Sequence, residues 1–289
     1  MTEQELHNAR RQKWRLDGRA VRTLEEAREF LESVGLCLVY PLKERLLAPT
    51  FIGAYAGSDE RLPTWQHAFA DARAQRATEL MVRLLRQKAA FEASLFGETN
   101  FLVAPSVFPY LYGLMGDRNP RQAAKPGAHS EYSPLARDVF EAIRRQGKIS
   151  KPRLRELLGG EPSAAALDRA LHELWSRLRI TRVDYNPEEG AFWDALLRWA
   201  PEPVRKGMNL SVQEALSALL SNYLDGVVAA ELVEVEEFFS HLAPRSRVRE
   251  AVNALLAARE LSFVTVGKKS MLQITPRRQE FTPRTRRKA

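Results

Sequence analysis

The chain has 289 residues, of which 45% are hydrophobic and 28% are charged, and it contains one cysteine, Cys37. This length allows two or three small domains with a sizeable core, and the composition is that of an ordinary globular protein. A single cysteine excludes an internal disulfide and a cysteine-based zinc site. No apolar run approaches the roughly 20 residues that a membrane span needs. The sequence therefore predicts a cytoplasmic protein without a membrane segment.

The formal net charge of +8 lies at the two ends of the chain. Residues 1–22 contain six Lys or Arg and three acidic residues, and residues 276–289 contain six and one. We expect residues 1–22 to form a loose basic arm or a frayed helix. Residues 276–289 predict a disordered basic tail, because they contain two prolines and few apolar side chains. The balanced body, residues 23–275, therefore needs a local patch if it binds nucleic acid.

Residues 23–115 predict an α/β-flavoured N-terminal domain. A capping box at Thr23 and Glu26 begins a helix, and the apolar run at residues 36–40 predicts a buried strand. The pattern from Trp65 to about Phe96 predicts an arginine-rich helix, whose charged face is typical of a solvated surface but also suits phosphate binding. A divergent winged helix is a second interpretation of this domain.

The rest of the chain contains one element order twice. Residues 116–132 are rich in Gly, Pro, Asn and Arg and predict a linker. Residues 133–200 predict a helix, a short strand, two helices and a hairpin, and residues 201–275 predict the same order. This order is that of a winged helix-turn-helix. The predicted fold class is therefore α+β, mainly helical, with tandem winged helix-turn-helix modules behind the N-terminal domain.

Candidate DNA contacts lie on the third helix of each module, opposite its apolar stripe, and on the second hairpin. The tip of the first hairpin carries Glu188 and Glu189, which phosphates would repel, so only the second hairpin is predicted to contact DNA. The ten candidate DNA-binding residues are Arg169, His172, Ser176, Arg179, Arg245, Ser246, Arg249, Asn253, Lys268 and Lys269.

Searches for catalytic and cofactor motifs give no candidates. The five histidines lack metal-ligand spacing, and the chain contains no G-x-G-x-x-G, no Walker loop and no G-x-S-x-G elbow. We therefore predict no metal and no cofactor, and no catalytic residue is assigned.

The module order, with the connecting run Trp199–Val204 followed by Glu214–Leu216, resembles the AlkZ-type winged-helix DNA glycosylases. These bacterial proteins consist of tandem winged helices and excise alkylated or crosslinked bases. The resemblance spans about residues 23–275 and implies double-stranded DNA as the partner and DNA repair as the role. The family carries a Gln-x-Gln or Gln-x-Asp pair near its N-terminus, proposed to hold the attacking water. None of the ten glutamines here begins such a pair.

Three functions remain open at this point. In the first hypothesis the chain is a DNA-binding protein whose third helices enter grooves and whose second hairpin contacts backbone. In the second it is a divergent DNA glycosylase, which would need a deep pocket between modules to receive a flipped nucleotide. In the third the winged helices form a scaffold for protein contacts.

Overall fold

The computed structural model describes residues 1–42, 46–64, 66, 70–94, 100–122 and 132–276. Within them the chain forms helices and three small antiparallel sheets, which confirms the predicted mixture of mainly helical and β structure. The same order of elements occurs three times, in units that we name the first (residues 24–103), the second (134–195) and the third (212–274).

The first unit begins with the helix predicted from the capping box at Thr23 and Glu26. Its elements are α2 (Leu24–Val34), β1 (Leu36–Leu38), α3 (Phe51–Ala56), α4 (Ala72–Arg86), β2 (Phe91–Ser94) and β3 (Asn100–Val103). The expected helix from Trp65 to about Phe96 is wrong at its C-terminal end, because Lys88 adopts a left-handed φ of 55° and the chain then returns as β2. Residues 65, 67–69, 95 and 96 of that expected helix lie outside the described residues.

The second unit follows helix α5 (Phe108–Met115) and the predicted linker, of which residues 123–131 lie outside the described part. Its elements are α6 (Pro134–Gln146), β4 (Ile149–Ser150), α7 (Lys151–Leu157), α8 (Ala164–Trp175), β5 (Ile180–Asn186) and β6 (Gly190–Ala195). Two short helices then lead onward, α9 (Leu196–Trp199) and α10 (Pro201–Met208).

The third unit contains α11 (Val212–Val227), α12 (Leu232–Phe239), α13 (Arg245–Ala257), β7 (Leu261–Val266) and β8 (Lys269–Ile274). Its first strand is reduced to Ala230, whose backbone exchanges hydrogen bonds with Leu272 of β8. The sheet orders are β1-β3-β2 in the first unit and β4-β6-β5 in the second, so in all three units the first strand or bridge pairs with the last strand.

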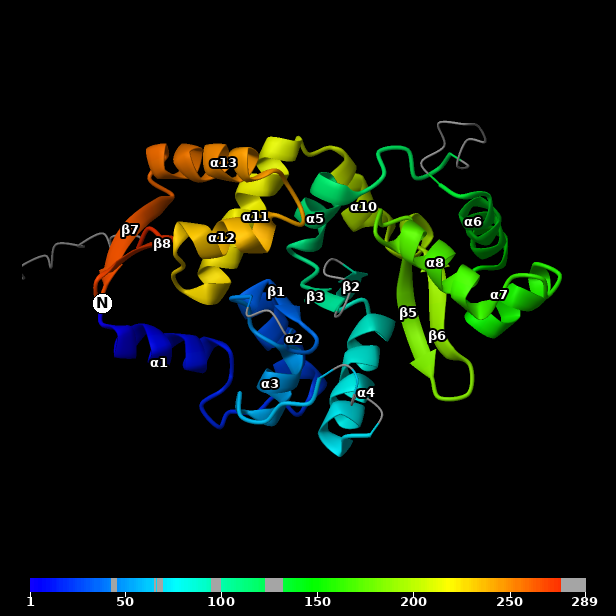
Figure 1. The fold of residues 1–289 in the computed structure, drawn as a ribbon, viewed down its shortest axis with the longest axis horizontal. Helices are drawn as coiled ribbons and strands as arrows, with labels where there is room; N and C mark the ends of the chain where they lie inside the picture. The colour runs from blue at the N-terminus through cyan, green and yellow to red at the C-terminus, as the bar shows by residue number, and fades with distance from the viewer. Residues whose placement is uncertain (43–45, 65, 67–69, 95–99, 123–131, 277–289) are drawn as a thin grey trace, which may run out of the picture.

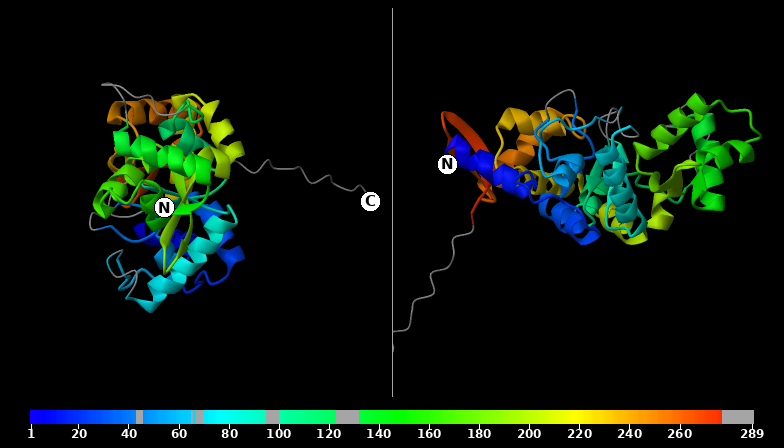
Figure 2. Two further views of the ribbon diagram at one scale, coloured as in Figure 1. Left: turned by 90° about the vertical axis from the view of Figure 1, so that its right-hand side faces the viewer. Right: turned by 90° about the horizontal axis from the view of Figure 1, so that it is seen from below.

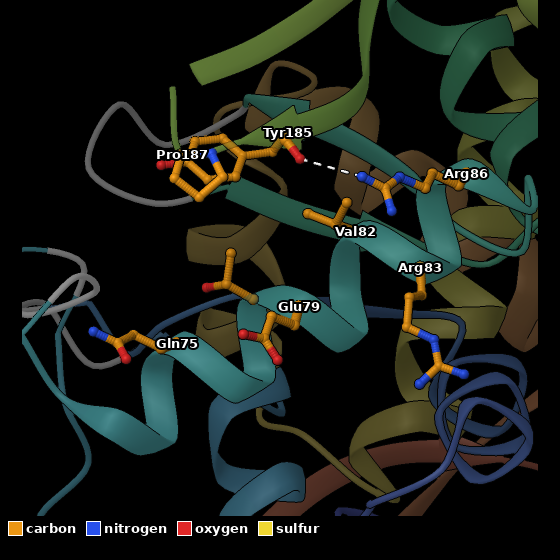
Figure 3. A pocket seen from close by; sticks show the side chains of 8 residues that line it. Gln75, Glu79, Val82, Arg83, Arg86, Tyr185 and Pro187 are labelled. Carbon is orange, nitrogen blue, oxygen red and sulfur yellow. Dashed lines mark hydrogen bonds between the residues drawn. The ribbon is translucent and has the colours of Figure 1, made fainter. Parts of the chain in front are cut away.

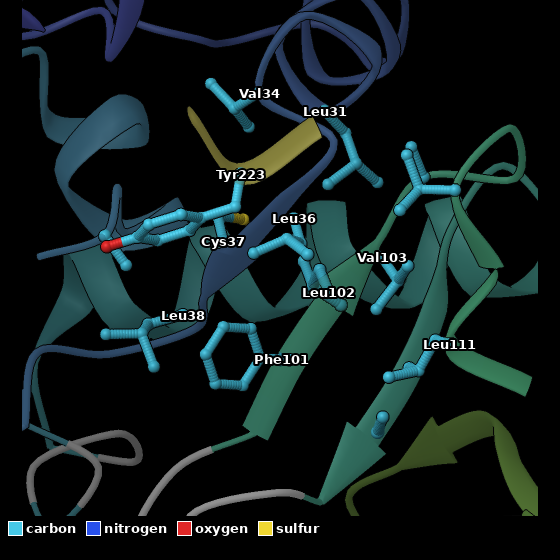
Figure 4. Close-up of a cluster of buried hydrophobic side chains, with 14 of the residues drawn as sticks. Leu31, Val34, Leu36, Cys37, Leu38, Phe101, Leu102, Val103, Leu111 and Tyr223 are labelled. Atoms are coloured by element: carbon cyan, nitrogen blue, oxygen red, sulfur yellow. The ribbon is translucent and has the colours of Figure 1, made fainter. Parts of the chain in front are cut away.

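The two largest hydrophobic clusters among the described residues do not correspond one to one with the three units. Side chains of the first and third units belong to one cluster, in which Tyr223 of α11 packs among residues of β1 and β3 (Figure 4). The rings of Tyr223 and Phe238 lie 4.3 Å apart, and Phe238 also meets Phe101 of β3. The second unit has its own core and lies at one end of the molecule (Figures 1 and 2).

Cys37 is fully buried within the shared core. Burial raises the pKa of its thiol, so the side chain stays a neutral, unreactive thiol at physiological pH. This environment agrees with the buried strand predicted from the apolar run at residues 36–40.

The N-terminal residues are more ordered than predicted. Instead of a loose arm or a frayed helix, residues 3–13 form helix α1 (Glu3–Lys13), with a capping box between Thr2 and Glu5. Leu6 is buried against Val266 and Met271 of the last hairpin. The prediction failed because a single leucine on a polar helix gives almost no periodic signal, although its burial against a neighbouring unit orders the segment.

Candidate nucleic-acid interface

A groove of about 520 Å³ lies between the first and second units (Figure 3). One wall is a face of α4, and the other is the end of β5 with the turn that follows it. The lining residues are Gln75, Thr78, Glu79, Val82, Arg83, Arg86, Tyr185 and Pro187. This volume lies within the roughly 300–1,000 Å³ of sites that hold small organic ligands.

Helix α4 presents this wall because its apolar residues recur on the opposite face. The Asp71 carboxylate caps the helix by accepting the backbone N–H groups of Arg73 and Ala74, at 2.7 and 3.1 Å. Residues such as Leu80 and Leu84 are buried in the shared core. The polar residues at spacings of three and four are consequently directed away from that core.

An ion-pair cluster at Asp184 joins the two walls. The Asp184 side chain on β5 is 9% exposed, and Arg86 of α4 donates to it over 2.6 Å while Lys148 donates to its other oxygen. Arg86 also donates to the Tyr185 carbonyl, the bond drawn in Figure 3. Burial alone would raise the pKa of Asp184, but the hydrogen bonds from Lys148 and Arg86 outweigh it and leave that pKa below its ordinary value.

A buried polar cluster lies close to the groove and also connects the two units. The Glu92 side chain of β2 is 1% exposed, and one of its oxygens accepts from Asn100 at 2.6 Å and from Arg182 of β5 at 3.1 Å. The guanidinium of Arg182 lies over the rings of Trp175 and Trp193, 5.1 and 5.5 Å from their centroids. These contacts hold the β5–β6 hairpin in one orientation relative to α4.

Two arginines on α4 carry charge that no acid neutralises within the described part of the chain. Arg73 pairs with Asp71 and Arg86 pairs with Asp184. Arg76 and Arg83 are exposed and have no ion-pair partner among the residues that the structure describes. Figure 3 shows Arg83 extending from α4 away from Tyr185. The interface thus combines an aromatic wall with free cations at its edge.

Three of the four candidates around α8 remain accessible, at least in part. Arg169 and His172 are exposed on the helix, and His172 also lines a second pocket of about 320 Å³. Ser176 is half-buried, and its hydroxyl donates to the Glu173 carbonyl over 3.1 Å.

Arg179 does not contact solvent, so its prediction as a DNA contact is wrong. Its side chain is 1% exposed and donates to Asp117 at 2.7 Å and to the carbonyls of Asn119 and Gln122. The spacing from Ser176 to Arg179 assumed a continuing helix, whereas α8 ends at Trp175 and Leu178 has a left-handed φ of 53°. Arg179 therefore holds the segment before the second unit in place.

The candidates on α13 divide into exposed and paired side chains. Arg245, Ser246 and Asn253 are exposed. Arg249 is also exposed, but its guanidinium makes two hydrogen bonds to Glu236, one of them 3.0 Å long. The hydrogen bond from Arg249 holds the pKa of Glu236 below its ordinary value, so this pair stays ionised near neutral pH.

The two lysines at the second predicted hairpin differ in the same way. Lys268 is exposed at the turn between β7 and β8, whereas Lys269 donates to Glu231. Helix α1 lies against this hairpin, and the terminal amine of Met1 donates to the Thr265 carbonyl over 3.3 Å. The structure does not bring the candidates of α8 and α13 together, since these helices lie in separate parts of the molecule (Figure 1).

Comparison with known proteins assigns the chain to a family. The family model described as DNA glycosylase AlkZ-like matches residues 55–288. This chain belongs to the AlkZ-like DNA glycosylase family. The solved structure of Streptomyces sahachiroi DNA glycosylase AlkZ is similar to it with a TM-score of 0.61 and 15% sequence identity, over 95% of this chain and 70% of that one. A comparison with curated proteins found no match.

Membership of the AlkZ-like family confirms the resemblance predicted from the sequence and supports a role in DNA binding and DNA repair. The similarity to AlkZ at 15% identity establishes a shared fold. Within the described residues no helix is long and apolar enough to cross a membrane, and no three His, Cys, Asp or Glu side chains gather as a metal site.

The sequence analysis missed the part of this AlkZ-like chain where the free cations and the groove coincide. Arg76 and Arg83 lie in the predicted arginine-rich helix and Tyr185 lies in the module predicted for residues 133–200, but none of them is among the candidate DNA contacts. A usable signal existed: residues 24–103 follow the same element order as the two later units. The second interpretation of residues 23–115, a divergent winged helix, would have made α4 a third helix equivalent to α8 and α13.

Proposed function

We propose that this chain is a DNA-binding protein of DNA repair that holds duplex DNA with tandem winged helices, in the cytoplasm of a bacterium. The recurring order of elements and strand pairing in the three units supports this interpretation. In a winged helix the third helix enters a groove and the hairpin contacts the backbone beside it. The winged helices would then occupy residues 23–115, 133–200 and 201–275.

The observation that carries the proposal is the free charge on α4 in a member of the AlkZ-like family. Arg76 and Arg83 are exposed without an ion-pair partner among the described residues, beside a groove that the second unit completes. Exposed, unneutralised guanidinium groups are the side chains best suited to phosphates.

The other proposed contacts are the accessible candidates of the later units. On α8 these are Arg169 and His172, with Ser176 at its end, and on the third unit they are Arg245, Ser246, Asn253 and Lys268. Arg249 and Lys269 contribute less, because Glu236 and Glu231 neutralise them. Together these residues supply backbone contacts that position the protein and polar groups that reach base edges.

Binding of a fluorescent duplex at several salt concentrations tests this function. We expect the affinity of the full chain to fall steeply as salt rises, because each phosphate contact releases counterions. A chain that ends at Pro276 should keep most of the salt dependence, since the proposed contacts lie in the body. If only the full chain binds and the shortened one does not, the basic tail carries the binding and the proposal is lost.

Base excision is a second candidate function, favoured by the groove between units. An enzyme that acts on a flipped nucleotide needs such a pocket, and the family is one of DNA glycosylases. No catalytic residue is assigned, since no glutamine begins the Gln-x-Gln or Gln-x-Asp pair. Release of free base from an alkylated duplex, measured by chromatography, would establish this activity, and its absence with intact DNA binding would leave the binding function alone.

A further inference from the structure

We propose that the outer edge of strand β7 binds a second copy of this chain, with the two β7 strands paired antiparallel around a two-fold axis at Val264. The pairing would join two β7–β8 hairpins, each a two-stranded sheet, into one sheet of four strands. This inference goes beyond the proposed function, because it concerns a contact between proteins and does not depend on DNA.

Strand β7 has one side that no other strand occupies among the described residues. It pairs with β8 alone, and β8 lies between β7 and Ala230. Because the backbone of Leu272 on β8 exchanges hydrogen bonds with Ala230, the opposite residue Phe263 directs its N–H and C=O away from β8. The Thr265 carbonyl points outward in the same way and accepts from the Met1 amine over 3.3 Å. The backbone groups of Phe263 have no partner in the described part of the chain.

This edge lacks the features with which sheets avoid pairing with other chains. Residues 261–266 include no charged side chain and no proline, and their register with β8 is continuous, without a bulge. Charges, prolines and bulges are the usual protection of an exposed edge strand. Strand β7 is therefore an uninterrupted, uncharged template for another strand.

Most exposed large apolar side chains also belong to the third unit or contact it. Five such side chains are exposed in the described ranges, and four of them are Met1, Leu232, Val233 and Phe263. Phe263 on β7 is 59% exposed, and the Met1 amine is bonded to the same strand. Leu232 and Val233 begin α12, directly after the segment that bridges to β8. A concentration of exposed apolar side chains favours an interaction surface.

The charges at the two ends of β7 point to a second copy as the occupant. Glu260 precedes β7 and Lys268 follows it, and both are exposed without an ion-pair partner among the described residues. Antiparallel pairing centred on Val264 places Glu260 opposite Lys268 of the partner subunit. The two-fold axis repeats this contact, so opposite charges meet at both ends of the paired strands. A strand of another protein would need the same order of charges, which a second copy carries necessarily.

The same register also matches the backbone groups. It places Phe263 opposite Thr265 of the partner subunit, and both residues direct their N–H and C=O outward. The exposed Met1 amine is the group that pairing would displace, since it bonds to the Thr265 carbonyl. Helix α1 contacts a face of the hairpin through Leu6, whereas a partner strand would lie in the plane of the sheet.

Sedimentation velocity without DNA tests the proposal, because Lys268 is also a proposed DNA contact. As the concentration rises from about 1 to 200 μM, the mass of the wild-type chain should increase from the 32.8 kDa of one chain toward twice that value. A chain that ends at Pro276 should associate equally, since it keeps β7. A wild-type chain that stays monomeric throughout, or association that is lost with residues 277–289, would overturn the inference.

Charge reversal tests the register and the identity of the occupant. Glu260→Lys and Lys268→Glu should each raise the Kd of the dimer at least about fivefold, because like charges then meet at both ends. An equimolar mixture of the two variants should associate as tightly as the wild-type chain, since every lysine in the mixed dimer faces a glutamate. Glu161→Lys, at an exposed position of the second unit, is the matched control and should leave the Kd unchanged. A mixture that associates no better than the single variants would contradict the register.

Phe263→Pro tests the backbone contact. It removes the outward N–H, which β8 does not use, so the hairpin keeps its own hydrogen bonds while the dimer should be lost. Circular dichroism establishes that each variant is folded. Dimerisation that survives Phe263→Pro would show that the edge of β7 is not the contact. DNA binding is measured separately, so failure of this inference leaves the proposed function unchanged.

Discussion

Helices α4 and α13 occupy the same position in the first and third units, yet their arginines have different electrostatic environments. Arg76 and Arg83 on α4 have no ion-pair partner among the described residues, whereas Arg249 on α13 is held by the buried carboxylate of Glu236. The adjoining hairpins differ too, since β5–β6 completes a groove with α4 while β7–β8 packs against α1. A count of basic residues in the sequence therefore overestimates the charge that either helix offers to DNA, because Arg73 and Arg86 on α4 and Arg249 on α13 are paired with acidic side chains.

The largest expected effect is on stability, when a buried arginine of the second unit is replaced; replacing an exposed arginine of the same unit should have almost none. We expect Arg179→Met to lower the free energy of unfolding by about 3–5 kcal/mol, because it leaves Asp117 and two carbonyls without their donor. Urea unfolding measures the change. Arg169→Met, on the exposed face of α8, should change stability by less than about 0.5 kcal/mol. Similar stabilities for the two variants would show that Arg179 is not a structural residue.

A smaller loss of stability is expected when the ion-pair cluster between the first and second units is disrupted. We expect Asp184→Asn to destabilise the chain by about 1–3 kcal/mol at pH 7, because Arg86 and Lys148 lose their shared carboxylate. The folded pKa of Asp184 lies below its unfolded value near 3.9, so this contribution is present above about pH 4 and is lost as the pH falls through the folded pKa.

Urea unfolding of both chains at pH 7 and at about pH 2.5 checks the sign. The difference in stability between wild type and Asp184→Asn should shrink at the lower pH. A difference that stays constant or grows on acidification would contradict the assignment of a lowered pKa to Asp184.

The smallest expected effect is on DNA affinity, when Arg249 of the third unit loses its acidic partner Glu236. We expect Glu236→Gln to raise duplex affinity about twofold at low salt and to leave it unchanged at high salt, because Arg249 becomes available and screening removes the gain. Glu202→Gln is the control, since it removes the partner of Arg205 on α10. Weaker duplex binding by Glu236→Gln would contradict the interpretation that Glu236 keeps Arg249 from contacting DNA.

Local patterns in the sequence predicted much of the fold. The capping box at Thr23 begins α2, and the apolar stripes of α8 and α13 are buried. These features depend on neighbours within four residues along the chain, so the sequence contains the information. The stable order of helix α1 was not predicted, because it depends on Leu6 packing against residues about 260 positions away.

The site was predicted less well, for the same physical reason. The pairing of Arg249 with Glu236 joins two helices, and the burial of Arg179 depends on a left-handed turn at Leu178. The groove combines α4 with a hairpin about 100 residues later in the chain. Neither spacing nor composition reports such contacts, so the unpaired arginines of α4 could be identified only once the units were placed together.

The most direct measurement compares two double variants in duplex binding over a range of salt concentrations, with folding verified for each. These are Arg76→Gln/Arg83→Gln on α4 and Arg249→Gln/Lys269→Gln in the third unit, and Arg145→Gln/Lys206→Gln is the control of equal charge. We expect the α4 pair to lower affinity at least about tenfold and to reduce the slope of log affinity against log salt by about two. The third-unit pair should change that slope by less than about one. A larger loss for the third-unit pair than for the α4 pair would contradict the claim that the free cations of α4 hold the DNA.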